Sequence, residues 1–164
     1  MRGGDWLDGV LSTYIERDGT DATGQIAAMV RESRHYGQIR AVLLNGVTFG
    51  GFNVVGLKEL HRATGLPAIA VMRRMPDMQS IRAALDNLPD PEQRYRAILS
   101  AGEIVEVQTP WQGGPVYIQC QGIDKADAAA LVAASAVHSR IPEPLRAAHL
   151  IATGVILGES SKRA

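Results

Sequence analysis

The residues of this chain that are able to take part in ligand chemistry gather in one stretch, residues 39–55. Asn45, Thr48 and Asn53 offer amide and hydroxyl groups there, which hydrogen-bond to bases and phosphates. The run Phe49-Gly50-Gly51-Phe52 adds two aromatic rings and a bare backbone. This combination indicates a binding loop in which Phe49 stacks on a base of single-stranded DNA. The alternative interpretation is an ordinary turn whose phenylalanines cover the end of the sheet.

Local positive charge provides a second candidate contact. Arg73-Arg74 follows an apolar run and is predicted to lie at the same edge of the sheet as Asn45, where the pair would meet phosphate. Arg34-His35 and Lys162-Arg163 are similar groups, and for all three pairs the alternative is a solvated surface. The formal net charge of +0 and the pI near 6.9 argue against a protein that coats DNA, but not against an enzyme that contacts a few phosphates.

The usual catalytic motifs are absent from the sequence. It has no glycine-rich dinucleotide or phosphate loop, no nucleophile elbow and no cysteine–histidine metal spacing. The 4 histidines fall on separate predicted helices, where a structural or solvated role is the alternative to catalysis. The single cysteine, Cys120, excludes an internal disulfide and is interpreted as a small buried residue.

Two apolar runs position these residues. Residues 41–44 and 67–72 are predicted to be strands buried on both faces, and a helix over 54–64 that ends at Gly65 joins them as a right-handed crossover. Ligands of open α/β sheets bind beyond the carboxyl ends of such strands, which is where Asn45 and Arg73 fall.

The remaining patterns predict an α/β layered structure with a mixed sheet in a single domain, 1–164. The predicted elements are a strand over 7–15, helices over 22–35, 76–87, 89–100, 124–138 and 144–157, and an antiparallel pair formed by 103–108 and 116–121.

Composition is that of an ordinary globular protein, with 46% hydrophobic and 21% charged residues. No apolar run approaches the roughly 20 residues that cross a bilayer, and the start has no signal-peptide core. We therefore expect a cytoplasmic protein without a membrane partner, and the sequence leaves a homo-oligomer open.

Several long motifs resemble the archaeal endonuclease dU family, a former family of unknown function related to endonuclease V. The longest are Leu44-Asn-Gly-Val-Thr-Phe-Gly-Gly-Phe-Asn-Val-Val55 and Ser139-Arg-Ile-Pro-Glu-Pro-Leu-Arg-Ala-Ala-His-Leu-Ile-Ala152. Segments 2–11, 33–38, 65–67, 71–73, 158–160 and 163–164 extend the resemblance over essentially the whole chain.

The resemblance implies a ribonuclease H-like three-layer fold and DNA repair chemistry. The implied activity is an endonuclease that uses Mg²⁺ or Mn²⁺ to cut DNA beside a deaminated base, uracil in particular, with clustered carboxylates holding the metal. Of the four metal-site positions, this chain keeps His149 alone. Asn45 and Gly24 stand where carboxylates are usual, and Gly56 departs from a common aspartate.

The first strand of the family would precede Arg2 and supplies the leading aspartate. The resemblance places that strand centrally, between residues 7–15 and 41–44, so its absence is expected to leave unpaired strand edges.

Two functional hypotheses follow. In the first, the chain is an impaired endonuclease dU-like enzyme. Asn45 and His149 are then its remaining catalytic residues and weak metal ligands, because a neutral amide replaces a carboxylate poorly at a hard cation. In the second, it is a non-catalytic relative that binds nucleic acid or a partner protein. The predicted nucleic-acid contacts are Thr48, Phe49, Gly50, Gly51, Asn53, Arg73 and Arg74.

Overall fold

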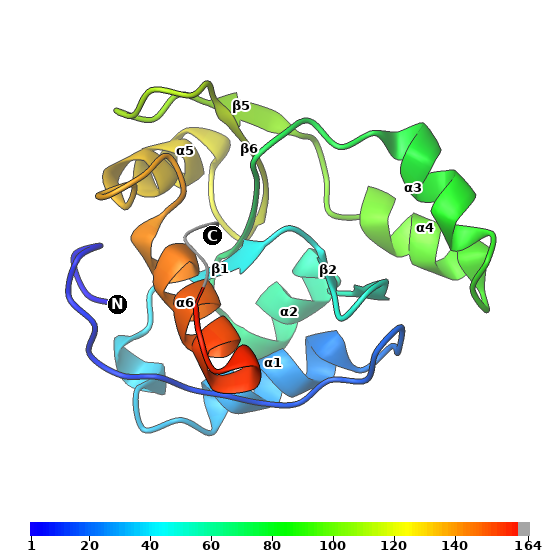
Figure 1. The fold of residues 1–164 in the computed structure, drawn as a ribbon, viewed down its shortest axis with the longest axis horizontal. Coiled ribbons are helices and arrows are strands. Elements are labelled where there is room, and N and C mark those ends of the chain that lie inside the picture. Colours follow the sequence, from blue (N-terminus) through cyan, green and yellow to red (C-terminus); the bar gives the residue numbers. More distant parts are fainter. Residues whose placement is uncertain (161–164) are drawn as a thin grey trace.

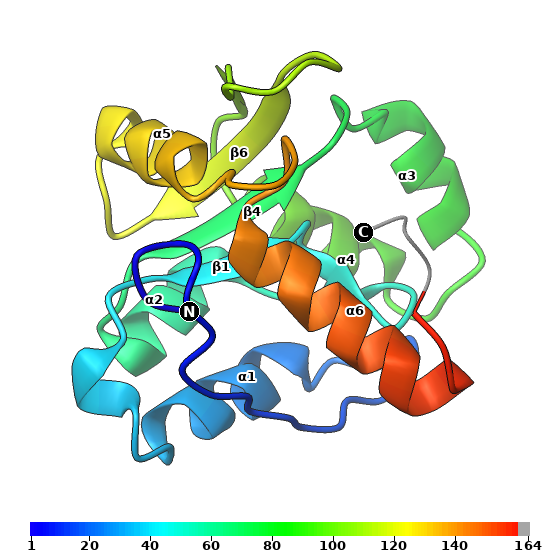
Figure 2. The same cartoon turned by 60° about the vertical axis from the view of Figure 1, so that its left-hand side comes forward.

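A mixed sheet built on the two apolar runs forms the centre of the protein. The computed structural model describes residues 1–160. Strand β1 (Val42–Asn45) pairs in parallel with β4 (Ala68–Met72), as Figure 2 shows, while β6 (Val116–Gln121) and β5 (Val105–Val107) continue the sheet in antiparallel pairings. The strand order is β1-β4-β6-β5. The predicted mixed sheet and its late antiparallel pair are confirmed.

Helices alternate with these strands along the chain (Figure 1). A separate hairpin follows β1 and consists of β2 (Thr48–Phe49) and β3 (Asn53–Val54). The helices are α1 (Ala22–Arg31), the short 3₁₀ helix η1 (Tyr36–Gln38), α2 (Leu57–Thr64), α3 (Met78–Leu85), α4 (Pro91–Leu99), α5 (Lys125–Ala134) and α6 (Glu143–Leu157).

Local signals set several helix ends. The Asp77 carboxylate accepts hydrogen bonds from two backbone N–H groups at the start of α3, and Asp124 does the same for one N–H of α5. Gly65 ends α2 with a φ of 67°, a left-handed conformation that glycine adopts without strain. The predicted helices in these places are confirmed, with shorter ends than predicted.

The sheet is covered on both faces, which makes three layers (Figures 1 and 2). Ala68 and Ala70 face a core shared with α1, α2, α3 and α4. Ile69 and Val71, which alternate with them along β4, face a second core shared with α5 and α6. The predicted three-layer α/β class is therefore confirmed.

The predicted strand over residues 7–15 is wrong. This segment runs over the surface without regular structure, and Leu7, Val10 and Tyr14 are exposed by 50%, 55% and 91%. Strand propensity is expressed only where a neighbouring strand supplies hydrogen bonds and a surface to pack on. Among residues 1–160, nothing pairs with this segment or with the outer edge of β1. The place of the family's first strand, which the resemblance puts beside β1, stays a prediction.

The helix predicted over residues 22–35 ends earlier, at Arg31, and the chain then turns into η1. Asp21 occupies the N-cap position but makes no capping hydrogen bond, because its carboxylate binds the backbone of Glu16 and the side chain of Asn53 instead. Within residues 1–160, no helix combines the length and the apolar character that crossing a membrane requires.

Candidate nucleic-acid interface

The carboxyl ends of β1 and β4 meet at one edge of the sheet. Asn45 ends β1 and pairs with Val71 of β4, so both side chains lie on the same face, and Arg73 continues this alternation beyond the end of β4. Val71 belongs to the core that α6 covers, and α6 packs against β1 (Figure 2). The edge therefore brings Asn45 and Arg73 close to the helix that carries His149.

A second arginine joins Arg73 at this edge. The guanidinium of Arg140 donates hydrogen bonds to the carbonyls of Gly113 and Pro115, in the loop that leads into β6. The Nη2 atom of Arg73 is buried and has no hydrogen-bond partner within residues 1–160. Burial and the positive charge of Arg140 together lower the pKa of Arg73. Neither Arg73 nor Arg140 has an ion-pair partner within residues 1–160, so the pair forms an unbalanced positive site, and the neighbouring Arg74 is exposed.

His149 is half-buried on α6, and its Nε2 atom is shielded from solvent without a hydrogen-bond partner in the described part of the chain. The start of α6 is held in place by Glu143, whose buried carboxylate accepts two hydrogen bonds from Arg146 and contacts Nδ1 of His138. Asn45 is exposed, and its side chain makes no hydrogen bond to residues 1–160. Asn45 therefore offers accessible hydrogen-bonding groups at the surface, whereas the unpaired Nε2 atom of His149 is shielded from solvent.

The glycine–aromatic loop is the β2–β3 hairpin, and the loop at residues 16–19 covers its turn. Asp18 accepts a hydrogen bond from the Phe52 N–H, and its own N–H donates to Gly50. A Cβ atom at Gly51 would lie 2.1 Å from Asp18 Oδ1, so only glycine fits. Phe49 is half-buried and packs against the core, while Thr48 points toward a cavity described below. The predicted contacts of these residues with nucleic acid stay predictions.

Asn53 is buried, whereas a residue that binds nucleic acid was expected to lie at the surface. Its side chain is fully buried, accepts a hydrogen bond from the Ala22 N–H, and donates to Glu16 and Asp21. These bonds tie the hairpin to the start of α1. In this conformation the amide is not accessible to a ligand, since its hydrogen-bonding groups serve the protein's own backbone.

Arg94 on α4 was not singled out from the sequence. Its guanidinium is buried and donates to the carbonyl oxygens of Gly19, Phe52, Asp18 and Pro89. It therefore joins α4, the hairpin and the loop before α1. No sequence signal separates Arg94 from Arg96, the other arginine of α4, because most partners of Arg94 come from distant segments.

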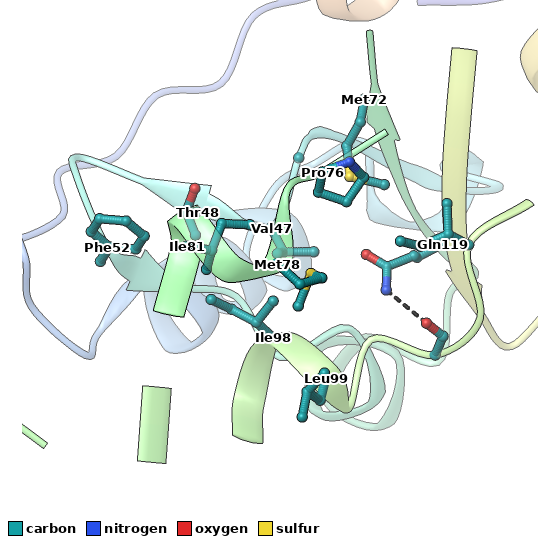
Figure 3. Close-up of a pocket in the computed structure, with 13 residues that line it drawn as sticks. Val47, Thr48, Phe52, Met72, Pro76, Met78, Ile81, Ile98, Leu99 and Gln119 are labelled. Carbon is teal, nitrogen blue, oxygen red and sulfur yellow. Dashed lines mark hydrogen bonds between the residues drawn. The ribbon is translucent and has the colours of Figure 1, made fainter. Parts of the chain in front are cut away.

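A cavity of about 370 Å³ lies on the other face of the same edge. Most of its lining is apolar and includes Met72, Met78 and Ile98 (Figure 3). Two polar side chains, Thr48 and Gln119, reach it as well. Gln119 was not singled out from the sequence, where it is one polar residue in an otherwise ordinary strand pattern.

Comparison with known proteins places the chain in a family. The family model described as endonuclease dU matches residues 1–156. The chain belongs to the endonuclease dU family. A UPF0215 protein of Methanosarcina acetivorans is 55% identical over 164 residues, covering 100% of this chain and 84% of that protein. The UPF0215 protein of Methanothermobacter thermautotrophicus is 53% identical over 161 residues, covering 98% of this chain and 78% of that protein.

One solved structure closely shares this fold. A protein of unknown function from Archaeoglobus fulgidus superposes with a TM-score of 0.86 at 40% identity, covering 95% of this chain and 86% of that one. Similarity to endonuclease V of Ciona intestinalis, solved with DNA that contains an inosine, is much weaker. Its TM-score is 0.47 at 16% identity, covering 84% of this chain and 65% of that one.

The residues present do not fit the metal that the endonuclease dU family implies. Within residues 1–160, no three histidine, cysteine, aspartate or glutamate side chains are placed to hold a metal ion. Asn45 and His149 together offer one amide and one imidazole, whereas Mg²⁺ and Mn²⁺ prefer several oxygen ligands with negative charge.

Proposed function

We propose that this chain acts in the cytoplasm as an endonuclease dU-like protein that binds deaminated, uracil-containing DNA, and that its metal-dependent cleavage is impaired. The observation that carries the proposal is the unbalanced positive site at the sheet edge. Arg73 and Arg140 lie together there, beside exposed Asn45, and one buried guanidinium nitrogen has no partner in the described chain. A phosphate bound beside half-buried Arg73 would supply the missing negative charge.

Impaired cleavage follows from the side chains at the same edge. Hydrolysis of a phosphodiester needs an activated water and stabilisation of the leaving oxygen, which clustered carboxylates and metal ions provide together. The amide of Asn45 still hydrogen-bonds to a base or phosphate, but it contributes no charge. Binding is therefore expected to persist where cleavage does not.

The second candidate function is a relative that binds nucleic acid or a partner protein without preference for deaminated bases. The substitutions at Asn45 and Gly24 favour it, since they remove the carboxylates that give the family its chemistry. The two candidates differ in one measurable property, which is selectivity for uracil.

A combined nicking and binding assay separates them. The intact chain is incubated with Mg²⁺ or Mn²⁺, or with EDTA as a control, on a labelled duplex that carries one deoxyuridine and on the unmodified duplex. We expect selective binding of the uracil duplex with little or no nicking. Equal binding of both duplexes favours the second candidate, and rapid metal-dependent nicking contradicts impairment. Failure to bind either duplex overturns the proposal.

Salt dependence tests the positive site itself. Arg73→Gln is expected to weaken binding of the uracil duplex and to reduce the slope of log K against log salt by about 1, because one phosphate contact is lost. Arg31→Gln, at the end of α1, is the matched control and should leave the slope unchanged. An unchanged slope in the Arg73 variant would show that Arg73 does not contact phosphate.

A further inference from the structure

The cavity at the sheet edge carries an inference beyond DNA binding. The cavity adjoins the predicted site in the sequence. Gly46 lines the cavity and directly follows Asn45, and the lining residues Met72 and Pro76 flank the segment that contains Arg73 and Arg74. A group held in the cavity would therefore be connected to the surface beside the positive site. No atom lies within 4 Å of a Cβ atom built on Gly46, so a bare stretch of backbone borders this space.

The cavity walls fit a flat, mainly apolar group. Met78, Ile81 and Ile98 contribute aliphatic and thioether surface from α3 and α4 (Figure 3). An aromatic ring is favoured in such an environment because its faces are apolar and its polar atoms lie along its edge. A nucleobase has this distribution, and enzymes that act on a base in DNA take it out of the stack into a pocket of this kind.

Of the two polar side chains that line the cavity, Gln119 is held by a hydrogen bond that fixes the orientation of its amide. Gln119 on β6 is only 6% exposed, and its Nε2 donates a hydrogen bond of 2.7 Å to the carbonyl of Gly102. A carbonyl accepts but cannot donate, so the amide nitrogen must face Gly102 and Oε1 must face the other way. Figure 3 shows this oxygen directed into the cavity, and it accepts no hydrogen bond from residues 1–160.

A fixed acceptor distinguishes a deaminated base from its parent. Ring nitrogen N3 of cytosine is an acceptor, whereas deamination to uracil converts it into an N–H donor. We propose that the cavity receives an extruded uracil and that Gln119 Oε1 accepts the hydrogen bond from its N3–H. Cytosine would instead place two acceptors against each other in a mainly apolar cavity, which is unfavourable.

This inference rests on the proposed binding of uracil-containing DNA, and names the residue that reads the base. It makes Gln119 a specificity-determining residue, while Asn45, Arg73 and Arg140 contact the sugar–phosphate backbone. The acceptor alone does not separate uracil from thymine, which also has an N3–H. The decisive comparison is therefore between uracil and cytosine.

Gln121 provides a matched control. It lies two positions along β6, and its Nε2 contacts the carbonyl of Ala101 in the same turn that Gln119 anchors, but it does not line the cavity. Gln119→Leu removes the turn anchor and the cavity acceptor together, while Gln121→Leu removes a turn anchor alone. Thermal unfolding of both variants establishes that they are folded.

The test measures affinity for single-stranded oligonucleotides by fluorescence anisotropy, with deoxyuridine or deoxycytidine at one position. We expect the natural chain and Gln121→Leu to prefer deoxyuridine by at least about tenfold, and Gln119→Leu to bind both oligonucleotides within about twofold of each other. A preference that persists in a folded Gln119→Leu variant overturns the inference but leaves the proposed function intact. Absence of any preference in the natural chain overturns both.

A change on the ligand side keeps the test independent of how the variant folds. An oligonucleotide with N3-methyl-deoxyuridine lacks the donor and is measured with the natural chain. We expect its affinity to fall to that of the deoxycytidine oligonucleotide. Affinity equal to that of deoxyuridine would overturn the assignment of N3–H as the group that Gln119 reads.

Discussion

At the scale of single residues, two asparagines of the same motif differ in role: one is structural and the other is free to contact a ligand. Asn45 and Asn53 both belong to the motif that resembles the endonuclease dU family, yet Asn45 is exposed and Asn53 is fully buried. Buried polar groups must be hydrogen-bonded, and Asn53 meets this requirement with the backbone of α1 and of residue 16. The residue that remains free to contact a ligand is Asn45.

This difference predicts opposite effects on stability. Asn53→Ala should lower the free energy of unfolding by about 2–3 kcal/mol, because it leaves buried backbone groups unpaired. Asn45→Ala should change it by less than about 0.5 kcal/mol, as is usual for an exposed side chain. Urea unfolding measures both. Equal, small effects would contradict the structural task assigned to Asn53.

At the scale of elements, α6 depends on an ion pair at its first turn. The guanidinium of Arg146 lowers the pKa of Glu143, and the contact with His138 acts in the same direction, while burial opposes both. A carboxyl group with a lowered pKa in the folded state stabilises the fold at pH above its ordinary value of 4.5. That contribution is lost as the pH falls through the lowered value.

Glu143→Gln should therefore reduce the free energy of unfolding by about 2 kcal/mol at pH 7, since charge-assisted hydrogen bonds are lost. The difference between the natural chain and the variant should shrink as the pH falls below 4.5 and through the lowered pKa of Glu143, where the carboxylate of the folded protein becomes protonated. Chemical unfolding across this range is the measurement. Glu32→Gln, at an exposed position just after α1, serves as control, and a pH-independent difference would contradict the assignment.

The β2–β3 hairpin is the second element whose task is measurable. Phe49 packs against the core, so Phe49→Ala should lower the free energy of unfolding by about 2 kcal/mol, less than for a fully buried ring. If Phe49 also stacks on a base, affinity for single-stranded DNA falls in the folded variant. Thermal unfolding and fluorescence anisotropy separate the two effects. Unchanged stability with lower affinity would contradict the packing role.

At the scale of the whole molecule, the chain before α1 is the least integrated part. Residues 7–15 pair with no strand among residues 1–160, and several of their apolar side chains are exposed. Segments with few backbone hydrogen bonds and little burial open at low free energy. This property follows from the absence of a neighbour rather than from the composition of the segment.

Limited digestion with chymotrypsin should therefore cut first after Leu11 or Tyr14, with Tyr14 exposed by 91%. Tyr95, on α4, is the internal comparison and should be protected. Mass spectrometry of the early products identifies the sites. A first cut within α3 or α4 would contradict the assignment of residues 7–15 as the weakest segment.

The sequence by itself determined the elements whose signals are local. The runs that became β1 and β4 are apolar, which predicted two strands, but only β4 is buried along most of its length, while Leu44 alone is buried in β1. Asp77, Asp124 and Gly65 define helix ends through their nearest neighbours. Parallel pairing then placed Asn45 and Arg73 at one edge of the sheet, because the carboxyl ends of parallel strands meet there.

Only the tertiary structure decided which polar residues are free. Burial of Asn53 and Arg94, the approach of Arg140 to Arg73, and the orientation of Gln119 all depend on partners that lie far away in the sequence. Residues 7–15 show the same dependence in reverse, since strand-forming side chains remain irregular where no strand lies beside them. Propensity and spacing act over a few residues, whereas hydrogen-bond satisfaction and strand pairing require the folded chain.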